Sequence, residues 1–161
     1  QDGSLERVRG QFRYVVIDCP PSLGLLTLNA LVAAEGALIP LQCEYFALEG
    51  LAQLVRTLDT VRTRVNPLLE IEGIVFTLFD GRTTLTTQVR AEVERYFKGH
   101  VFATVIPRNV RLSEAPSHGR SILQYDVRSP GAVAYLELAK EVMGRDEART
   151  RTGSGRPPAA G

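Results

Sequence analysis

A single acidic residue, Asp18, ends a short β-branched run and is followed closely by two prolines. The run, residues 13–18, predicts a strand buried on both faces of a sheet. An Asp at the carboxyl end of such a strand points into the crevice where parallel α/β sheets bind ligands. Its carboxylate could hold Mg²⁺, usually through water, or could simply cap a turn. Pro20 and Pro21 fix the backbone and predict a stiff loop that could respond to a bound phosphate.

Arginine is the second residue type with a chemical role to consider. Of the 19 basic residues only Lys98 and Lys140 are lysines, and the planar guanidinium of arginine suits phosphate and carboxylate. A GC-rich coding sequence explains the overall excess equally well. Arg82 and Arg111 stand at expected loop-to-helix junctions, where they either solvate the surface or reach phosphate oxygens without reading bases. Arg90 and Arg120 could extend such a patch.

Composition fits one soluble domain with a core. The chain has 161 residues, of which 44% are hydrophobic and 23% charged, and its formal net charge of +1 indicates no particular partner. Cys19 and Cys43 have no close metal-ligand spacing and are expected to be small buried thiols in a reducing compartment. No apolar run reaches the length of a membrane span, and no signal peptide is recognisable. We therefore expect a cytoplasmic protein.

Strands and helices alternate along the chain and would position these residues. Strands are expected at residues 13–18, 37–41, 71–79 and 101–106. Helices are expected after Ser22, at residues 47–65 and 84–97, and from Pro130 onward. This alternation predicts βαβ units in an α/β fold, with a mostly parallel, doubly wound sheet and flanking helices.

The last helix has clear start and stop signals. Ser129 is the expected N-cap, Pro130 the first helical residue, and Gly144 the residue just past the end. The expected core-facing residues of this helix are Val133, Leu136, Ala139, Val142 and Met143. We expect one domain over residues 1–144 and a disordered tail over residues 145–161, which lack apolar periodicity.

Four segments, taken together, resemble one family in order and spacing. They are residues 15–31 (V-V-I-D-C-P-P-S-L-G-L-L-T-L-N-A-L), 40–50, 77–83 and 106–119. The chain from about Tyr14 to Met143 thus resembles the ParA/Soj family of chromosome and plasmid partition ATPases. The resemblance implies a P-loop NTPase fold of the deviant Walker A (SIMIBI) type, incomplete in this chain.

The same resemblance implies roles for particular residues. Asp18 would be the magnesium-associated acid, and Pro20 and Pro21 would belong to switch II. The loop Pro107, Arg108 and Asn109 would line the nucleotide base. Arg82 and Arg111 match positions that serve non-specific DNA binding in the family.

Cofactors and partners follow from the resemblance as well. ATP and Mg²⁺ are the implied cofactors. The implied partners are non-specific DNA, a ParB-type protein that stimulates hydrolysis, and a second copy in an ATP-bound homodimer, with no membrane. The implied location is the cytoplasm, in association with the nucleoid.

The phosphate-binding loop of such ATPases is absent from the sequence. Neither G-x-x-x-x-G-K-[ST] nor the deviant K-G-G-x-G-K-T occurs, although phosphoryl transfer in these enzymes depends on that loop and its lysine. We therefore expect these residues to be the C-terminal portion of the ATPase, to hydrolyse no ATP alone and to bind no nucleotide. Loss of a central strand would leave apolar edges unpaired, so poor solubility or partial unfolding is also expected.

Two other functions fit part of the sequence. A non-enzymatic remnant that binds DNA or a partner would lack the phosphate loop, as this chain does. A MinD-like membrane-cycling ATPase would end in an amphipathic basic helix, but the residues after Gly144 include no large apolar side chain. The sequence favours the partition ATPase as the family of origin, whereas the missing phosphate loop favours the remnant for these residues taken alone.

Overall fold

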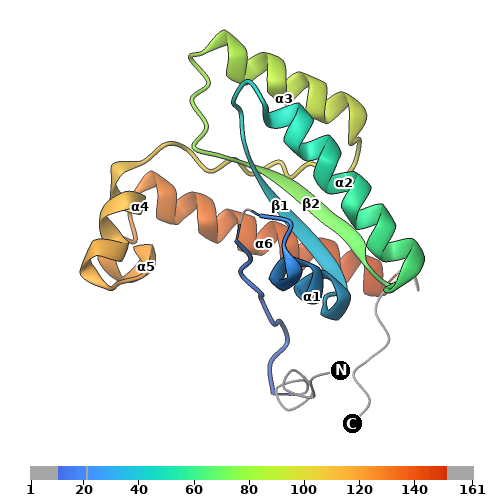
Figure 1. Cartoon of the computed structure of the whole chain (residues 1–161). Helices are drawn as coiled ribbons and strands as arrows, with labels where there is room; N and C mark the ends of the chain where they lie inside the picture. Colours follow the sequence, from blue (N-terminus) through green and yellow to red (C-terminus); the bar gives the residue numbers. More distant parts are fainter. Residues whose placement is uncertain (1–10, 21, 152–161) are drawn as a thin grey trace.

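The computed structural model describes residues 11–20 and 22–151. At its centre β1 (Gly36–Gln42) and β2 (Glu70–Thr77) pair in parallel, as Figure 1 shows. The helical elements are α1 (Leu25–Ala33), α2 (Ala47–Arg64), α3 (Thr84–Tyr96), α4 (Val110–Glu114), the 3₁₀ turn η1 (Ala115–His118), α5 (Ile122–Tyr125) and α6 (Pro130–Arg151). Among the described residues, no helix is both long and apolar enough to cross a membrane.

A βαβ unit forms the middle of the fold. The chain leaves β1, returns through α2 and enters β2, so that Gly36 lies opposite Glu70 and Gln42 opposite Thr77. A parallel pair needs such a crossover because its strands begin at the same end. The predicted α/β arrangement, a parallel sheet with flanking helices, is confirmed here.

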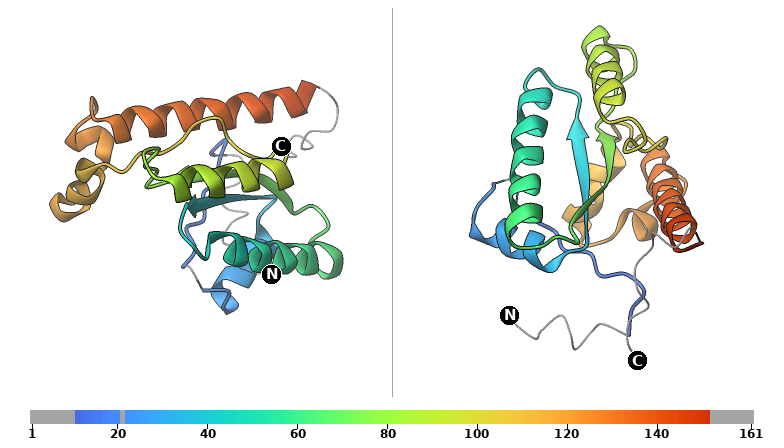
Figure 2. Two further views of the ribbon diagram at one scale, coloured as in Figure 1. Left: turned by 90° about the horizontal axis from the view of Figure 1, so that it is seen from above. Right: turned by 90° about the vertical axis from the view of Figure 1, so that its right-hand side faces the viewer.

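One face of this sheet is covered by α2 and α3 and holds the larger core. In β1 the buried side chains alternate, with Ile39 5% and Leu41 9% exposed, because successive residues of a strand point to opposite faces. The buried members of this core are Leu31, Ile39, Leu41, Leu51, Leu58, Val61, Leu69, Ile74, Phe76, Val89 and Val93. Two views in Figure 2 show α2 against the strands on this side.

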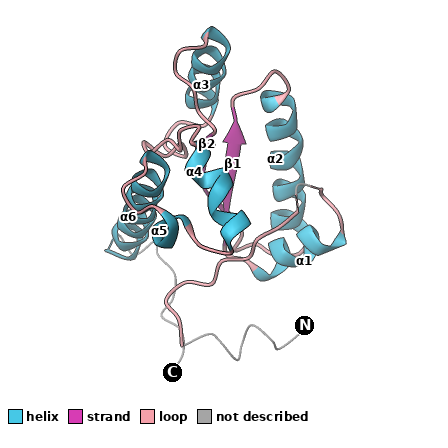
Figure 3. Cartoon of the chain, turned by 90° about the vertical axis from the view of Figure 1, so that its left-hand side faces the viewer, coloured by secondary structure: helices cyan, strands magenta, loops and turns pink. Residues whose placement is uncertain are grey.

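The opposite face is covered only in part. There α6 packs over β2 through a second cluster, Val75, Phe102, Ile106 and Leu138. On the same face of β1, Leu38 is 39% exposed. Figure 3, which looks along the sheet from the side of α4, shows α2 and α6 on opposite sides of the strands.

The predicted strand at residues 13–18 is wrong, because these residues form an extended segment outside any sheet. Val16 in this segment is 91% exposed. A strand is stabilised by ladder hydrogen bonds to a neighbour, and among the described residues β1 pairs only with β2. The segment instead contacts α6, where the Tyr14 hydroxyl donates a 2.7 Å hydrogen bond to Asp146.

The predicted strand at 101–106 is also wrong in detail. Its ends are hydrogen-bonded to β2, where Phe102 N donates to Ile74 O at 2.8 Å and Ile106 N donates to Phe76 O at 2.8 Å. Between these points the backbone N–H groups of Ala103 and Thr104 donate to the Glu141 carboxylate at 2.8 and 2.9 Å. A side chain of α6 thus takes donors that a continuous ladder would use, and the strand is interrupted.

The last helix begins as predicted but ends later. Ser129 caps it, accepting a 3.2 Å hydrogen bond from Ala132 N, whereas the helix continues through Gly144 to Arg151. Arg145 and Arg149, which follow the glycine, bind Glu141 at 2.8 Å and Glu72 at 2.6 Å. These contacts offset the roughly 1 kcal/mol that a helical glycine costs relative to alanine.

Two expectations for the end of the chain change as a result. Residues 145–151, predicted to be disordered, are helical, and residues 152–161 lie outside the described residues. The predicted core-facing residues of α6 are right only in part: Val142 packs against the second cluster, whereas Val133, Leu136 and Met143 are 48%, 39% and 41% exposed. The helix instead turns Leu138 toward the sheet.

Candidate functional site

A pocket of about 200 Å³ lies where β1 and β2 end. Its lining residues are Gln42, Cys43, Glu44, Leu78, Asp80, Thr83, Thr86 and Arg108. They come from the end of β1 and the segment after it, the loop after β2, the first turn of α3 and the loop before α4. The carboxyl ends of parallel strands are where open α/β sheets bind ligands, so this pocket is the candidate site.

Two loops of the site are tied together by their backbones. Phe79 N donates to Ile106 O at 3.1 Å, and Arg108 N donates to Phe79 O at 3.2 Å. Leu78, just before this contact, has φ of 48°, in the left-handed region that a bulky side chain rarely adopts. The loop of residues 78–83 therefore leaves β2 through a strained turn and is fixed to the loop of residues 107–109.

Arg82 forms a two-point ion pair inside its own loop. Its Nε and Nη2 donate to Asp80 Oδ1 and Oδ2 at 2.8 and 2.7 Å, and its backbone N donates to Oδ1 at 3.1 Å. The hydrogen bonds from the Arg82 side chain and backbone, with a smaller contribution from the charge of Arg108, lower the pKa of Asp80 to about 2. The Arg82 side chain remains 89% exposed, so it is presented at the surface while paired.

Arg111 is held in a similar way at the start of α4. The Asn109 side chain caps this helix by accepting from Arg111 N at 2.9 Å. The Arg111 guanidinium donates to Glu114 at 3.0 Å and lies 3.6 Å from an Asp126 oxygen. The hydrogen bond to Glu114 is the main reason that the pKa of Arg111 is raised above its ordinary value. Both arginines predicted to bind DNA thus lie beside carboxylates.

The other predicted site residues are distributed unevenly. Of the loop Pro107, Arg108 and Asn109, only Arg108 lines the pocket. Asp18 is exposed, forms no hydrogen bond or ion pair with another described residue, and is absent from the pocket lining. Pro20 is exposed next to it, and Pro21 lies outside the described residues.

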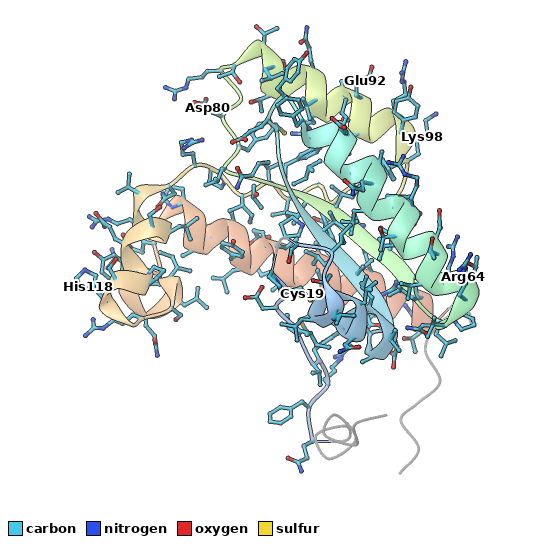
Figure 4. All side chains as sticks on the ribbon, viewed as in Figure 1. Cys19, Arg64, Asp80, Glu92, Lys98 and His118 are labelled. Carbon is cyan, nitrogen blue, oxygen red and sulfur yellow. The ribbon has the colours of Figure 1, made fainter. Side chains whose placement is uncertain are left out.

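Figure 4 shows that the pocket and the segment that carries Asp18 are apart. Asp80 lies just before α3, whereas Cys19, the neighbour of Asp18, lies near α1. Within residues 11–20 and 22–151, no group of three or more His, Cys, Asp and Glu side chains could hold a metal ion. Asp18 offers a lone carboxylate, and the described residues do not by themselves build a site for a magnesium–nucleotide complex.

Comparison with known proteins decides the family. Residues 2–71 match the family described as AAA domain. The sporulation initiation inhibitor protein Soj of Bacillus subtilis is 58% identical over 139 residues, which cover 86% of this chain and 55% of that protein. The chromosome partitioning protein ParA of Myxococcus xanthus is 55% identical over 143 residues, covering 89% of this chain and 50% of that protein.

The chain is homologous to the Soj/ParA partitioning ATPases over most of its length. It spans about half the length of these curated relatives.

Solved structures give the same fold for this Soj/ParA homologue. A cobyrinic acid a,c-diamide synthase from Mycobacterium smegmatis with bound ATP analogue and magnesium matches with a TM-score of 0.69 and 35% identity, over 98% of this chain and 55% of that one. The Pyrococcus furiosus cell division ATPase MinD matches with a TM-score of 0.69 and 24% identity, over 87% and 55%. Both are P-loop NTPases, which confirms the predicted fold class.

Sequence reasoning assigned no role to two carboxylates of the Soj/ParA homologue, Asp80 and Glu114. Each lies inside a segment that carries the family resemblance. Spacing offered a signal for both: Asp80 is two residues before Arg82, and Glu114 is three residues after Arg111 in a short helix. Side chains three apart on a helix are neighbours.

Proposed function

We propose that this chain forms part of a ParA/Soj-type partition ATPase and that Arg82 and Arg111 bind DNA phosphates without sequence preference. One observation carries the proposal. Arg82 lies on the loop that follows β2, and Arg111 lies in the first turn of α4, directly after the loop of residues 107–109. The two loops are joined by hydrogen bonds between Phe79 and residues 106 and 108. Exposed guanidinium groups held on one end of a sheet suit contacts with a phosphate backbone.

The rest of the proposal follows from the resemblance of the sequence to the ParA/Soj family. The whole protein would dimerise when it binds ATP and Mg²⁺, bind DNA as that dimer on the nucleoid in the cytoplasm, and be stimulated by a ParB-type partner. Asp18 would associate with the magnesium ion through water, with Pro20 and Pro21 in switch II beside it. Pro107, Arg108 and Asn109 would line the base. ATP and magnesium would supply the phosphoryl group and the charge that neutralises it.

The DNA proposal is tested with the 161-residue chain and a random-sequence 30-base-pair duplex. Fluorescence anisotropy between 50 and 200 mM KCl should show binding that weakens with salt, because released counterions contribute to the affinity. Arg82→Glu combined with Arg111→Glu should weaken binding at 50 mM KCl by at least about tenfold and lower the salt slope by about 2, one for each lost phosphate contact.

A charge-matched control separates contact from bulk charge. Arg62 on α2 and Arg95 on α3 are exposed and paired with Asp59 and Glu92. Arg62→Glu combined with Arg95→Glu makes the same change in net charge away from the two loops. If both double variants bind DNA equally well, Arg82 and Arg111 are not the contacts.

A second candidate function is that of a DNA-binding remnant without enzymatic activity. It is favoured by the lack of a glycine-rich phosphate loop in these residues. We expect the 161-residue chain to release no phosphate from ATP above the buffer rate. Both candidates predict that ATP and Mg²⁺ leave the DNA affinity of this chain unchanged, because it is expected to bind no nucleotide. They differ once the chain is joined to the part of Bacillus subtilis Soj that it does not cover. In that fusion an ATP-dependent increase in DNA affinity would support the partition ATPase, and an unchanged affinity would favour the remnant.

A further inference from the structure

One edge of the Arg82 guanidinium is already occupied by an internal anion. Asp80 meets the Nε and Nη2 side of the guanidinium at 2.8 and 2.7 Å. This is the two-point geometry in which arginine also binds a phosphate. A backbone hydrogen bond from Arg82 N to the same carboxylate, 3.1 Å long, holds Asp80 in this position.

We propose that Asp80 is an internal competitor for Arg82 and sets how tightly the chain binds DNA. The inference rests on the proposed DNA-binding function and deepens it by naming the residue that regulates the contact. A DNA phosphate must either displace the Asp80 carboxylate from the guanidinium fork or bind the remaining donors beside it. In both cases the negative charge of Asp80 opposes binding.

The surroundings of Asp80 strengthen this role. The backbone that carries it is restrained by the contact between Phe79 and Arg108, and its main-chain oxygen accepts from Thr83 N at 3.3 Å at the start of α3. Asp80 therefore stands on a restrained backbone turn that leads into the cap of α3, where Thr83 accepts from Thr86 N. Its low pKa keeps it ionised at neutral pH.

Asp80 also lines the pocket at the carboxyl end of the strands, together with Arg108. A molecule in the pocket that donates hydrogen bonds to the Asp80 carboxylate would weaken its hold on Arg82. The same residue thus belongs to the pocket and to the proposed DNA contact, and it provides a direct connection between them.

The test uses the 161-residue chain and the 30-base-pair duplex in the anisotropy assay. Asp80→Asn keeps the size of the side chain and removes its charge, so it should tighten binding about three- to tenfold at 50 mM KCl and steepen the salt slope by up to about 1. Asp80→Ala, which removes the acceptor altogether, should show at least the same gain. Far-UV circular dichroism verifies that each variant keeps its helices.

The matched control is Asp59→Asn. Asp59 pairs with Arg62 on α2 at 2.8 Å and is exposed, so this variant makes the same change in net charge away from the site. It should alter affinity less than twofold. In Asp80→Asn combined with Arg82→Ala, the gain should disappear, because the freed guanidinium is its source.

The outcomes distinguish failure of the competitor role of Asp80 from failure of the DNA-binding function. If the wild-type chain binds DNA but Asp80→Asn binds no more tightly than Asp59→Asn, the competitor role is wrong and the DNA-binding function stands. A gain that survives Arg82→Ala also overturns the role, because it then comes from general charge. If neither the wild type nor Asp80→Asn binds at 50 mM KCl, the DNA-binding function itself fails.

Discussion

The two faces of β1 carry similar aliphatic side chains in very different surroundings. Ile39 and Leu41 are 5% and 9% exposed under α2, whereas Leu38, the residue before Ile39, is 39% exposed on the other face. The extended segment before α1 resembles the second face, since Val16 there is 91% exposed. A covering helix, rather than the apolar character of a residue, decides whether a side chain contributes to the core.

The difference in exposure between the two faces of β1 indicates which part of the molecule contributes most to its stability. Burial of an aliphatic side chain contributes about 1.5–3 kcal/mol, and an exposed one contributes little. The unit from β1 through α3 therefore holds most of the free energy of folding. The outer face of β1 and the segment of residues 14–17 are apolar surfaces of the kind that associates with other molecules. The poor solubility expected from the sequence stays a prediction.

The sharpest test compares two neighbours in β1. Ile39→Ala should lower the free energy of unfolding by about 2–5 kcal/mol, because it leaves a cavity under α2. Leu38→Ala should lower it by less than about 1 kcal/mol, because that side chain keeps much of its contact with water. Urea unfolding followed by circular dichroism measures both values. Equal losses would mean that the outer face of β1 is covered in solution.

A smaller effect is expected where α6 meets the interrupted strand. Burial alone would raise the pKa of Glu141, but hydrogen bonds from the backbones of Ala103 and Thr104 and from Arg145 outweigh it and lower the pKa. Glu141→Gln should lower the free energy of unfolding at pH 7 by about 1–3 kcal/mol, as expected for hydrogen bonds to a charged group.

The pH dependence of this effect has a definite sign. A carboxylate with a lowered folded-state pKa stabilises the fold above its unfolded pKa, about 4.3 for Glu, and loses that contribution as the pH falls through the folded value. The gap between wild type and Glu141→Gln should therefore be full at pH 7 and smaller at pH 3.5, measured from urea midpoints. A gap that grows on acidification would show that Glu141 is not held as an anion.

The smallest effect concerns the segment before α1. Tyr14→Phe removes the hydroxyl that donates to Asp146 at 2.7 Å, and it should cost about 0.5–1.5 kcal/mol. Trypsin cleavage after Arg13 should become faster, since the segment loses a tie to α6. Tyr45→Phe is the control, because Tyr45 is 79% exposed and its hydroxyl forms no hydrogen bond with a described residue. Equal cleavage rates in both variants would show that the tie is not formed.

The spacing of apolar residues predicted those helices and strands whose formation depends mainly on nearby residues. The helix expected at residues 47–65 is α2 at Ala47–Arg64, and the strand expected at 37–41 is β1 at Gly36–Gln42. The strands expected at 13–18 and 101–106 failed because strand formation depends on distant partners, such as Glu141 of α6. The stripe predicted for α6 is right at Val142 but misses Leu138, because apolar residues occur on several sides of that helix and periodicity alone does not select one.

The candidate site was predictable in part for a similar reason. Resemblance drew attention to Arg82, Arg111 and Arg108, and Arg108 lines the pocket. The roles of Asp80 and Glu114 depend on side-chain geometry, which a motif does not contain. The assignments for Asp18, for switch II and for the base-lining loop stay predictions.

The length of α6 has a mechanical consequence. A helix of 22 residues is about 33 Å long, and α6 is anchored at both ends of the sheet. Near its start Gly131 leaves no room for a side chain, since a Cβ there would lie 2.6 Å from Leu112 Cγ of α4, while Arg149 near its other end is bound to Glu72 of β2. One helix therefore fixes the position of α4, which carries Arg111, relative to the beginning of β2 at the opposite end of the sheet.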